Sequence, residues 1–282
     1  MYKLFVFVFC LALFACSSGS EETPSEPVEE VEKPVTIFAV AGHVYGDATQ
    51  FTGSVHPPFM KKFREVKANL AADGMEINSL FLTGDVIARP TPARWDSTVQ
   101  QLDSLIDDWY IAPGNHDFGG GFNQIAQEAN YFSVKPEEDL FLVLNTSQRG
   151  WNVDPGQKHF IEARLKNLKE GANLFVFTHQ LWWQKDPPPE YEIDSIRTNS
   201  YALFDGDSSF WQTVFPMLKD LPNECYYFAG DLGADAVLES YYEDHWENHH
   251  FYGSGMGSKK ADNFLLGKVY EDGTVEIQRI DF

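Results

Sequence analysis

Ala-Pro-Gly-Asn-His-Asp, at residues 112–117, is the most informative stretch of the chain for its fold. A short apolar run precedes it, and three glycines follow one residue later. This order predicts a buried strand that ends in a polar loop, which is where open α/β sheets place their chemistry. In this loop the amide of Asn115 can ligate a hard metal ion, the imidazole of His116 can transfer a proton, and the carboxylate of Asp117 can orient that imidazole.

Other apolar runs end in the same way, with a small residue and then a possible ligand. The runs 35–40, 79–82, 173–177 and 225–229 lead to His43, Asp85, His179 and Asp231. Segments with helical spacing of apolar residues lie between them, at 58–73, 92–107, 157–169 and 210–221, and 131–146 and 264–280 are typical of strand pairs. The chain is therefore expected to be α/β, with its strand-end residues gathered at one edge of a sheet.

Over roughly residues 35–282 the order and spacing of these motifs resemble the calcineurin-like metallophosphoesterases. Gly84-Asp85 and Gly114-Asn115-His116-Asp117 match that family's motifs fully, and His179 matches its lone histidine. The resemblance implies a four-layer α/β/β/α sandwich with mixed sheets. It also implies hydrolysis of phosphate esters, in which a metal-activated water attacks phosphorus, His116 acts as general acid and Asp117 holds its ring.

Both outer motifs depart from the family pattern. The family begins with Asp-x-His, and this chain has Ala41-Gly42-His43; the family ends with Gly-His-x-His, and this chain has Gly-Asp-Leu-Gly at 230–233. One of the family's two metal sites therefore looks complete and the other looks damaged. Carried over by position, the complete site takes Asp85, Asn115, His179 and Asp231, and the damaged site keeps His43 and the bridging Asp85.

The resemblance implies one or two divalent ions, among Mn, Fe, Zn, Mg and Ca. A shell of two carboxylates, an amide and one imidazole favours Mn, Mg, Ca or ferrous iron over zinc. Three hypotheses stay open: a mononuclear hydrolase, a site rebuilt by replacement ligands, and a surface-exposed binding module that keeps the fold without catalysis. The candidate replacements are Asp235, His245, His249 and His250, although residues 243–250 are also typical of a solvated helix end.

A long polar segment, residues 180–209, is a candidate specificity loop, because loops of this length in compact domains are commonly functional. Trp182 and Trp183 are candidates for stacking on a sugar or nucleoside, or are core residues. Arg89 is a candidate phosphate contact, or an ordinary surface arginine. The expected partner is a small phosphorylated molecule, with glycans and nucleotides among the candidates.

Composition excludes some classes of function. The formal net charge of −21 repels polyanions, so nucleic acid is not an expected partner. Only Cys225 follows the N-terminal region, and so neither an intramolecular disulfide framework nor a Cys zinc cluster is expected in the domain.

The N-terminus has the pattern of an export signal. Residues 1–16 place Lys3 before an apolar run too short to span a bilayer, and the run ends in Leu-Phe-Ala-Cys, which resembles a bacterial lipobox with Cys16 as the lipidated residue. Residues 17–34 are rich in Ser, Pro and Glu and are expected to form a disordered acidic tether to the 35–282 domain. We therefore expect an exported protein, lipid-anchored to the cell envelope at the bacterial outer membrane.

Overall fold

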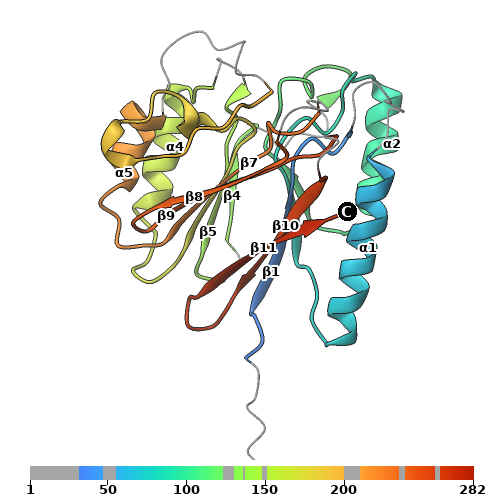
Figure 1. Cartoon of the computed structure of the whole chain (residues 1–282), viewed down its shortest axis with the longest axis horizontal. Helices are drawn as coiled ribbons and strands as arrows, with labels where there is room; N and C mark the ends of the chain where they lie inside the picture. The colour runs from blue at the N-terminus through green and yellow to red at the C-terminus, as the bar shows by residue number, and fades with distance from the viewer. Residues whose placement is uncertain are drawn as a thin grey trace, which may run out of the picture. The chain divides into compact units, whose positions relative to one another are not determined.

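Two mixed β-sheets lie face to face, and helices cover the outer face of each (Figure 1). The computed structural model describes residues 32–46, 55–122, 130–135, 137–147, 151–199, 210–234, 239–257 and 261–282. Lys33–Phe282 form one compact unit. The sequence of layers confirms the α/β/β/α sandwich expected from the sequence.

The first sheet has five strands in the order β11-β10-β1-β2-β3. Its members are β1 (Thr36–Ala41), β2 (Ser79–Leu82), β3 (Trp109–Ile111), β10 (Asn263–Val269) and β11 (Val275–Asp281). Strands β1, β2 and β3 run parallel, and β10 pairs antiparallel with both β1 and β11. The parallel register brings the carboxyl ends of β1, β2 and β3 to one edge.

The second sheet has six strands in the order β4-β5-β6-β7-β9-β8. Its members are β4 (Phe132–Val134), β5 (Leu140–Val143), β6 (Leu174–Phe177), β7 (Cys225–Ala229), β8 (Tyr241–Trp246) and β9 (His249–Ser254). Strands β5, β6, β7 and β9 are parallel, and β4 and β8 are antiparallel edge strands.

Aromatic side chains fill the space between the sheets. The ring of Phe38 on β1 meets five other phenylalanine rings edge-on, and Phe81 on β2 stacks on Phe177 of β6 with ring centroids 4.0 Å apart. Such pairs add about 0.5–1.5 kcal/mol each beyond the burial of their area. This layer fixes the two sheets against each other, and with them the strand ends that carry the polar residues.

Helices α1 (Pro57–Ala72) and α2 (Pro92–Asp103) cover the outer face of the first sheet (Figure 1). Helix α1 buries Phe59, Phe63 and Leu70, three residues at helical spacing. The side chain of Thr91 caps α2 by accepting a hydrogen bond from the backbone N–H of Arg94.

Helices α4 (Pro155–Leu165) and α5 (Phe215–Leu218) lie on the outer face of the second sheet. The segment 210–221, expected to be helical, is helical over residues 210–218, where a π-helical turn at Phe210–Val214 leads into the short α5. Pro216 cannot donate the backbone hydrogen bond that a continuous helix needs at that point. Short 3-10 turns occupy Trp182–Gln184 and Pro189–Tyr191.

The expectation of a helix end at 243–250 is also wrong. These residues belong to the antiparallel pair β8 and β9, in which Asp244 lies opposite Phe251 and His245 opposite His250. Glu247 in the connecting turn has a positive φ of 50°. Turns with positive φ match the twist of a hairpin, and they do not extend a helix.

Among the described residues, no helix combines the length and apolar character needed to cross a membrane. The predicted signal peptide, Cys16 and all but the last three residues of the predicted tether lie outside the described residues.

Candidate metal centre

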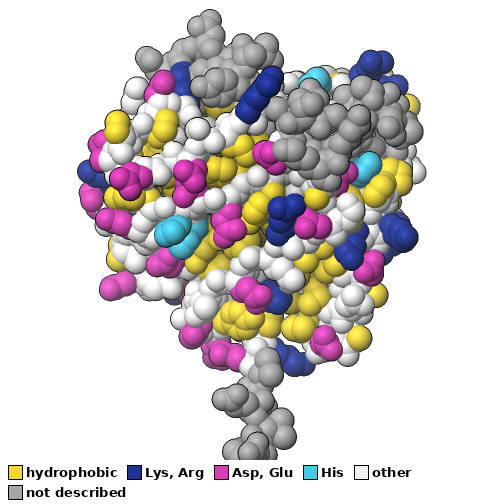
Figure 2. All heavy atoms as spheres, viewed as in Figure 1, with side chains coloured by type: hydrophobic (Ala, Val, Ile, Leu, Met, Phe, Trp, Pro, Cys, Tyr) yellow, Lys and Arg dark blue, Asp and Glu magenta, His cyan; other side chains and the backbone are white. Residues whose placement is uncertain are grey.

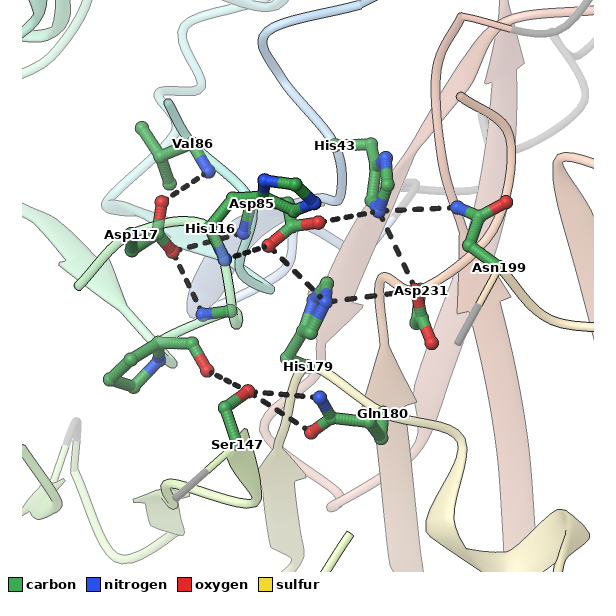
Figure 3. A network of polar contacts seen from close by, with 12 residues as sticks. His43, Asp85, Val86, His116, Asp117, Ser147, His179, Gln180, Asn199 and Asp231 are labelled. Atoms are coloured by element: carbon green, nitrogen blue, oxygen red, sulfur yellow. Dashed lines mark hydrogen bonds and ion pairs between the residues drawn. The ribbon is translucent and has the colours of Figure 1, made fainter. Parts of the chain in front are cut away.

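Four buried side chains meet where strands of the two sheets end (Figure 3). His43 follows β1, Asp85 follows β2, His179 follows β6 and Asp231 follows β7. Each is at most 2% exposed. The structure therefore brings together four of the five residues that the sequence offered as metal ligands.

Their polar atoms are close to one another. The Nε2 atom of His43 lies 3.1 Å from Asp85 Oδ2 and 3.6 Å from Asp231 Oδ1. The Nε2 atom of His179 lies 3.4 Å from Asp85 Oδ1 and 3.7 Å from the same oxygen of Asp231. Adjacent ligands of an ion with bonds of about 2.1 Å lie about 3.0 Å apart in octahedral geometry and about 3.4 Å apart in tetrahedral geometry. The spacing is that of a ligand shell.

The hydrogen bonds of His179 favour a cation at this point. Its Nδ1 lies 2.9 Å from the carbonyl oxygen of Thr83, which can only accept, so Nδ1 carries the proton. In the neutral ring Nε2 then presents a lone pair to two carboxylates. This nitrogen is buried and has no hydrogen-bond partner among the described residues. A lone pair that faces two negative charges is unfavourable, and either a second proton or a metal ion bound at Nε2 would remove this repulsion.

The charges of the cluster are strongly coupled. Burial opposes protonation of His43, but the carboxylates of Asp85 and Asp231 outweigh it and raise the pKa of His43 to about 9. Burial likewise opposes ionisation of Asp85, yet the imidazoles of His179 and His43 hold its pKa well below the usual range. In the absence of a metal the cluster therefore holds a proton on His43, where the carboxylates stabilise the positive charge.

Backbone conformation shows why the matched motifs contain these residue types. His43 and Asp85 both adopt positive φ, 50° and 53°, which is sparsely populated for residues other than glycine. Gly84 has φ of 78°, and a Cβ there would lie 2.5 Å from Nδ1 of His179. A Cβ on Gly114 would lie 2.2 Å from Oδ1 of Asp85. The glycines let the backbone approach the ligands closely.

Asp117 does not hold the His116 ring, and the role expected for it is corrected. Its Oδ1 accepts hydrogen bonds from the backbone N–H groups of Val86 and Ile87, at 2.8 and 3.1 Å. Its Oδ2 accepts from those of Asp85 and Gly114, at 2.9 and 2.8 Å. Burial, aided by the charge of Asp85, raises the pKa of Asp117 to about 7, and these donors act against that rise. Asp117 ties two strand-end loops together (Figure 3).

His116 stands at the exposed side of the centre. Its backbone N–H donates to Asp85 Oδ1 at 3.0 Å, and its Nδ1 lies 3.3 Å from the carbonyl of Ala88, which takes the place expected of Asp117. The ring remains exposed. Asn115, the fifth residue offered as a ligand, is exposed between Gly114 and His116, both of which approach Asp85.

The proposed stacking role of Trp182 and Trp183 is wrong. Both side chains are fully buried in the core between the second sheet and its helices, where they contact the ring of Phe210. A buried ring cannot stack on a substrate. Arg89 is exposed, and its carbonyl accepts from the guanidinium of Arg94; it lies next in the chain to Ala88.

Three of the candidate replacement ligands are engaged elsewhere or lie on the surface of the hairpin. His249 is buried, and its Nδ1 lies 2.9 Å from the hydroxyl oxygen of Tyr227. The Nε2 of His250 lies 2.7 Å from the carboxylate of Glu224. His245 is exposed on β8. Asp235 lies outside the described residues.

The sequence alone did not single out several residues around the centre. The side-chain nitrogen of Asn199 lies 3.2 Å from His43 Nε2, and Gln180 joins Ser147 beside His179 (Figure 3). The ring of Tyr45 lies 5.2 Å from that of His43 and 6.1 Å from that of His116, between centroids. Burial, followed by the charge of Asp85, raises the pKa of Tyr45 above its usual range. Gln180 follows a motif residue directly, and this adjacency was the only signal in the sequence.

The donor set suits a divalent metal ion. His43, His179 and Asp231 each place one ligand atom within 4.8 Å of the others, and Asp85 contacts both imidazoles. Two imidazoles with two carboxylates make a more nitrogen-rich set than the one expected, since His43 joins the other three in one cluster. Imidazole suits zinc and iron, and carboxylate suits manganese as well.

A protein-family model and several solved structures are similar to this chain. The family model for calcineurin-like phosphoesterases matches residues 52–241, which is more than half of the chain. No curated protein sequence matches the chain. Similar solved structures include a double mutant of Vps29 from Entamoeba histolytica, with 10% identity and a TM-score of 0.37, covering 88% of this chain and 99% of that one. Phosphopantetheinyl hydrolase (PptH) from Mycobacterium tuberculosis has 11% identity and a TM-score of 0.42, with coverage of 80% and 90%.

That family depends on divalent metal ions and hydrolyses phosphoesters, and three of the four buried side chains, those of Asp85, His179 and Asp231, lie within the matched residues 52–241. The chain belongs to the calcineurin-like phosphoesterases.

Proposed function

We propose that this protein is a metal-dependent hydrolase of phosphate esters that works with one ion, held by His43, Asp85, His179 and Asp231. The observation that carries the proposal is the buried Nε2 of His179, which has no hydrogen-bond partner among the described residues and faces two carboxylates at 3.4 and 3.7 Å. A divalent ion, of which manganese, iron and zinc suit the donors best, would polarise the phosphoryl oxygen and activate water for attack on phosphorus.

The residues of the chain divide the remaining work. The carboxylate of Asp85 accepts a hydrogen bond from the backbone N–H of His116 and thereby sets the position of that residue relative to the ligands. The Nδ1–H of His116 donates to Ala88, so Nε2 is the atom that can pass a proton to the leaving oxygen. Exposure of this ring allows a substrate to reach it.

The test compares turnover with metal content. Aryl phosphate mono- and diesters serve as substrates after the purified chain is supplied with manganese, iron or zinc. His116→Ala should keep metal and fold but lose turnover about 10²–10⁴-fold, whereas His159→Ala, an exposed histidine on α4, should change neither. Asp85→Ala should lose the metal.

Three results would contradict the proposal or part of it. A wild-type chain that binds no ion in these solutions is not a metallohydrolase. A chain that binds the ion but turns over neither ester class is not a phosphoesterase of this kind, and full activity in His116→Ala would remove the acid role.

Substrate is proposed to be a small phosphorylated molecule. Acidic side chains are scattered over the visible face of the molecule in Figure 2, with Lys and Arg between them, and the chain carries a net charge of −21. Such a surface disfavours binding of nucleic acid. The metal ion would hold the anionic phosphate group of the substrate locally, because the charge of the ion dominates the site.

The non-catalytic binding module finds less support. The tryptophans that could have served such a module by stacking on a sugar or nucleoside, Trp182 and Trp183, are both buried. We also propose that the chain is exported and lipid-anchored through Cys16, with residues 17–34 as a tether. The lipobox-like end of the apolar run and the acidic, proline-rich composition after it support this localisation.

A further inference from the structure

A series of hydrogen bonds runs from the second sheet to the loop that carries His116. The side-chain amide of Gln180, the residue after His179, donates to the hydroxyl of Ser147 at 2.9 Å (Figure 3). The hydroxyl of Ser147 donates to the carbonyl oxygen of Pro113, also at 2.9 Å. Ser147 lies after β5 and Pro113 lies after β3, so one hydroxyl joins strand ends of the two sheets.

The donors in this series have one consistent direction. Thr146, which is fully buried, donates its hydroxyl to the amide oxygen of Gln180, so the amide nitrogen faces Ser147. The hydroxyl of Ser147 also lies 3.2 Å from that amide oxygen, but the carbonyl of Pro113 is closer. If the amide were turned over, its oxygen would take the hydrogen of Ser147, and Pro113 would lose this donor. Gln180 therefore directs the hydroxyl of Ser147 towards Pro113.

The proposed general acid and part of the ligand set belong to different sheets. The backbone N–H of His116 donates to Asp85, which follows β2 of the first sheet, whereas His179 follows β6 of the second. Proton transfer requires the acid to lie within hydrogen-bond reach of the leaving oxygen, and a displacement of about 1 Å can cost about 10²-fold in rate. The bond from Ser147 to Pro113 fixes the loop of the first sheet against a strand end of the second.

We propose that Ser147, directed by Gln180, is a positioning residue for the general acid His116. It acts through the carbonyl of Pro113, which stands shortly before His116 in the same loop. The inference rests on the proposed function. Loss of the hydroxyl is expected to leave the metal ligands in place and to weaken protonation of the leaving oxygen.

The test compares two esters that differ in their need for an acid. Phenyl and 4-nitrophenyl esters are used, because 4-nitrophenolate leaves readily without a proton and phenolate does not. Ser147→Ala should keep the metal content of the wild type and lower kcat for the phenyl ester about 10–100-fold, with a much smaller loss for the 4-nitrophenyl ester. In a His116→Ala background the same change should cause no further loss, because two residues that act through one step are not additive.

A conservative variant and a matched control complete the test. Ser147→Thr keeps the hydroxyl and should restore most of the turnover. Ser104→Ala is the control, because the exposed hydroxyl of Ser104 also accepts from a side chain, that of Arg64, and donates to a carbonyl, that of Gln101. The imidazole resonances of His116 in nuclear magnetic resonance spectra, assigned by their absence in His116→Ala, should shift in Ser147→Ala and stay unchanged in Ser104→Ala.

The possible failures are distinguishable. If the wild type binds no ion or turns over neither ester, the proposed function itself fails. Equal losses for both esters in Ser147→Ala, additive losses with His116→Ala, or unchanged His116 resonances overturn the positioning role and leave the proposed function standing. Should Ser147→Ala not fold, Gln180→Glu decides by the same ester comparison at full metal occupancy, because it keeps the acceptor for Thr146 and removes the donor to Ser147.

Discussion

Replacing Asp117 tests the largest difference between the sequence-based role of a site residue and its place in the structure. A residue that orients His116 would be needed for turnover and little needed for folding. The structure instead gives the carboxylate four backbone donors, from Asp85, Val86, Ile87 and Gly114, at 2.8–3.1 Å. We therefore expect Asp117→Ala to destabilise the fold itself.

The magnitude follows from the donors left behind. A buried N–H without a partner costs about 1–3 kcal/mol, and water entering the vacated space will satisfy some of the four. Single substitutions rarely exceed about 4–5 kcal/mol, so Asp117→Ala should lower the free energy of unfolding by about 3–5 kcal/mol. Asp117→Asn keeps one acceptor oxygen and turns an N–H₂ group towards two donors, and should cost about 2–4 kcal/mol.

The assay is urea unfolding of the metal-free chain at about pH 8, above the raised pKa of Asp117 of about 7, so that the carboxylate is ionised. A changed midpoint with an unchanged slope reports stability. Asp107→Ala, at an exposed aspartate, is the control and should stay within about 0.5 kcal/mol of wild type. A loss below about 1 kcal/mol in Asp117→Ala, or a fully stable Asp117→Asn that has lost only turnover, would refute the four-donor account.

Three further predictions concern other parts of the chain. The pKa of His43 is raised to about 9 from 6.5, so its contribution to stability, about 3 kcal/mol, is complete below about pH 6.5 and is lost as pH rises through 9. Unfolding of the metal-free chain across this range should show that loss, and His43→Gln should abolish it. Trp183→Ala should cost about 3–5 kcal/mol in unfolding experiments, while affinity for phosphate esters, measured by calorimetry, stays unchanged in the folded fraction. Cys16→Ser should remove labelling by a fatty-acid probe and release the protein from the detergent phase; continued labelling would rule out Cys16 as the acylated residue.

Local sequence is sufficient to determine the fold class and the positions of the strand ends. Apolar runs that end in Gly-Asp or Gly-Asn-His-Asp report local requirements, of which the positive φ of the backbone at Gly84 is an example. Such requirements are carried by the neighbouring residues alone. The same local pattern is enough to predict that Asp85, His179 and Asp231 follow strands whose ends meet, and the fold confirms this position for all three.

What each polar residue faces was decided only by the tertiary structure. Asp117 stands next to His116 in the chain, but its donors come mainly from 85–87, on a different strand end. Asn199 carries no motif and reaches His43 across more than 150 residues of chain. The tryptophans at 182–183 are polar-segment residues in the sequence and core residues in the fold. The direction of a side chain at a strand end, and the partner it meets, depend on how the two sheets pack, which is a property of contacts far apart in the sequence.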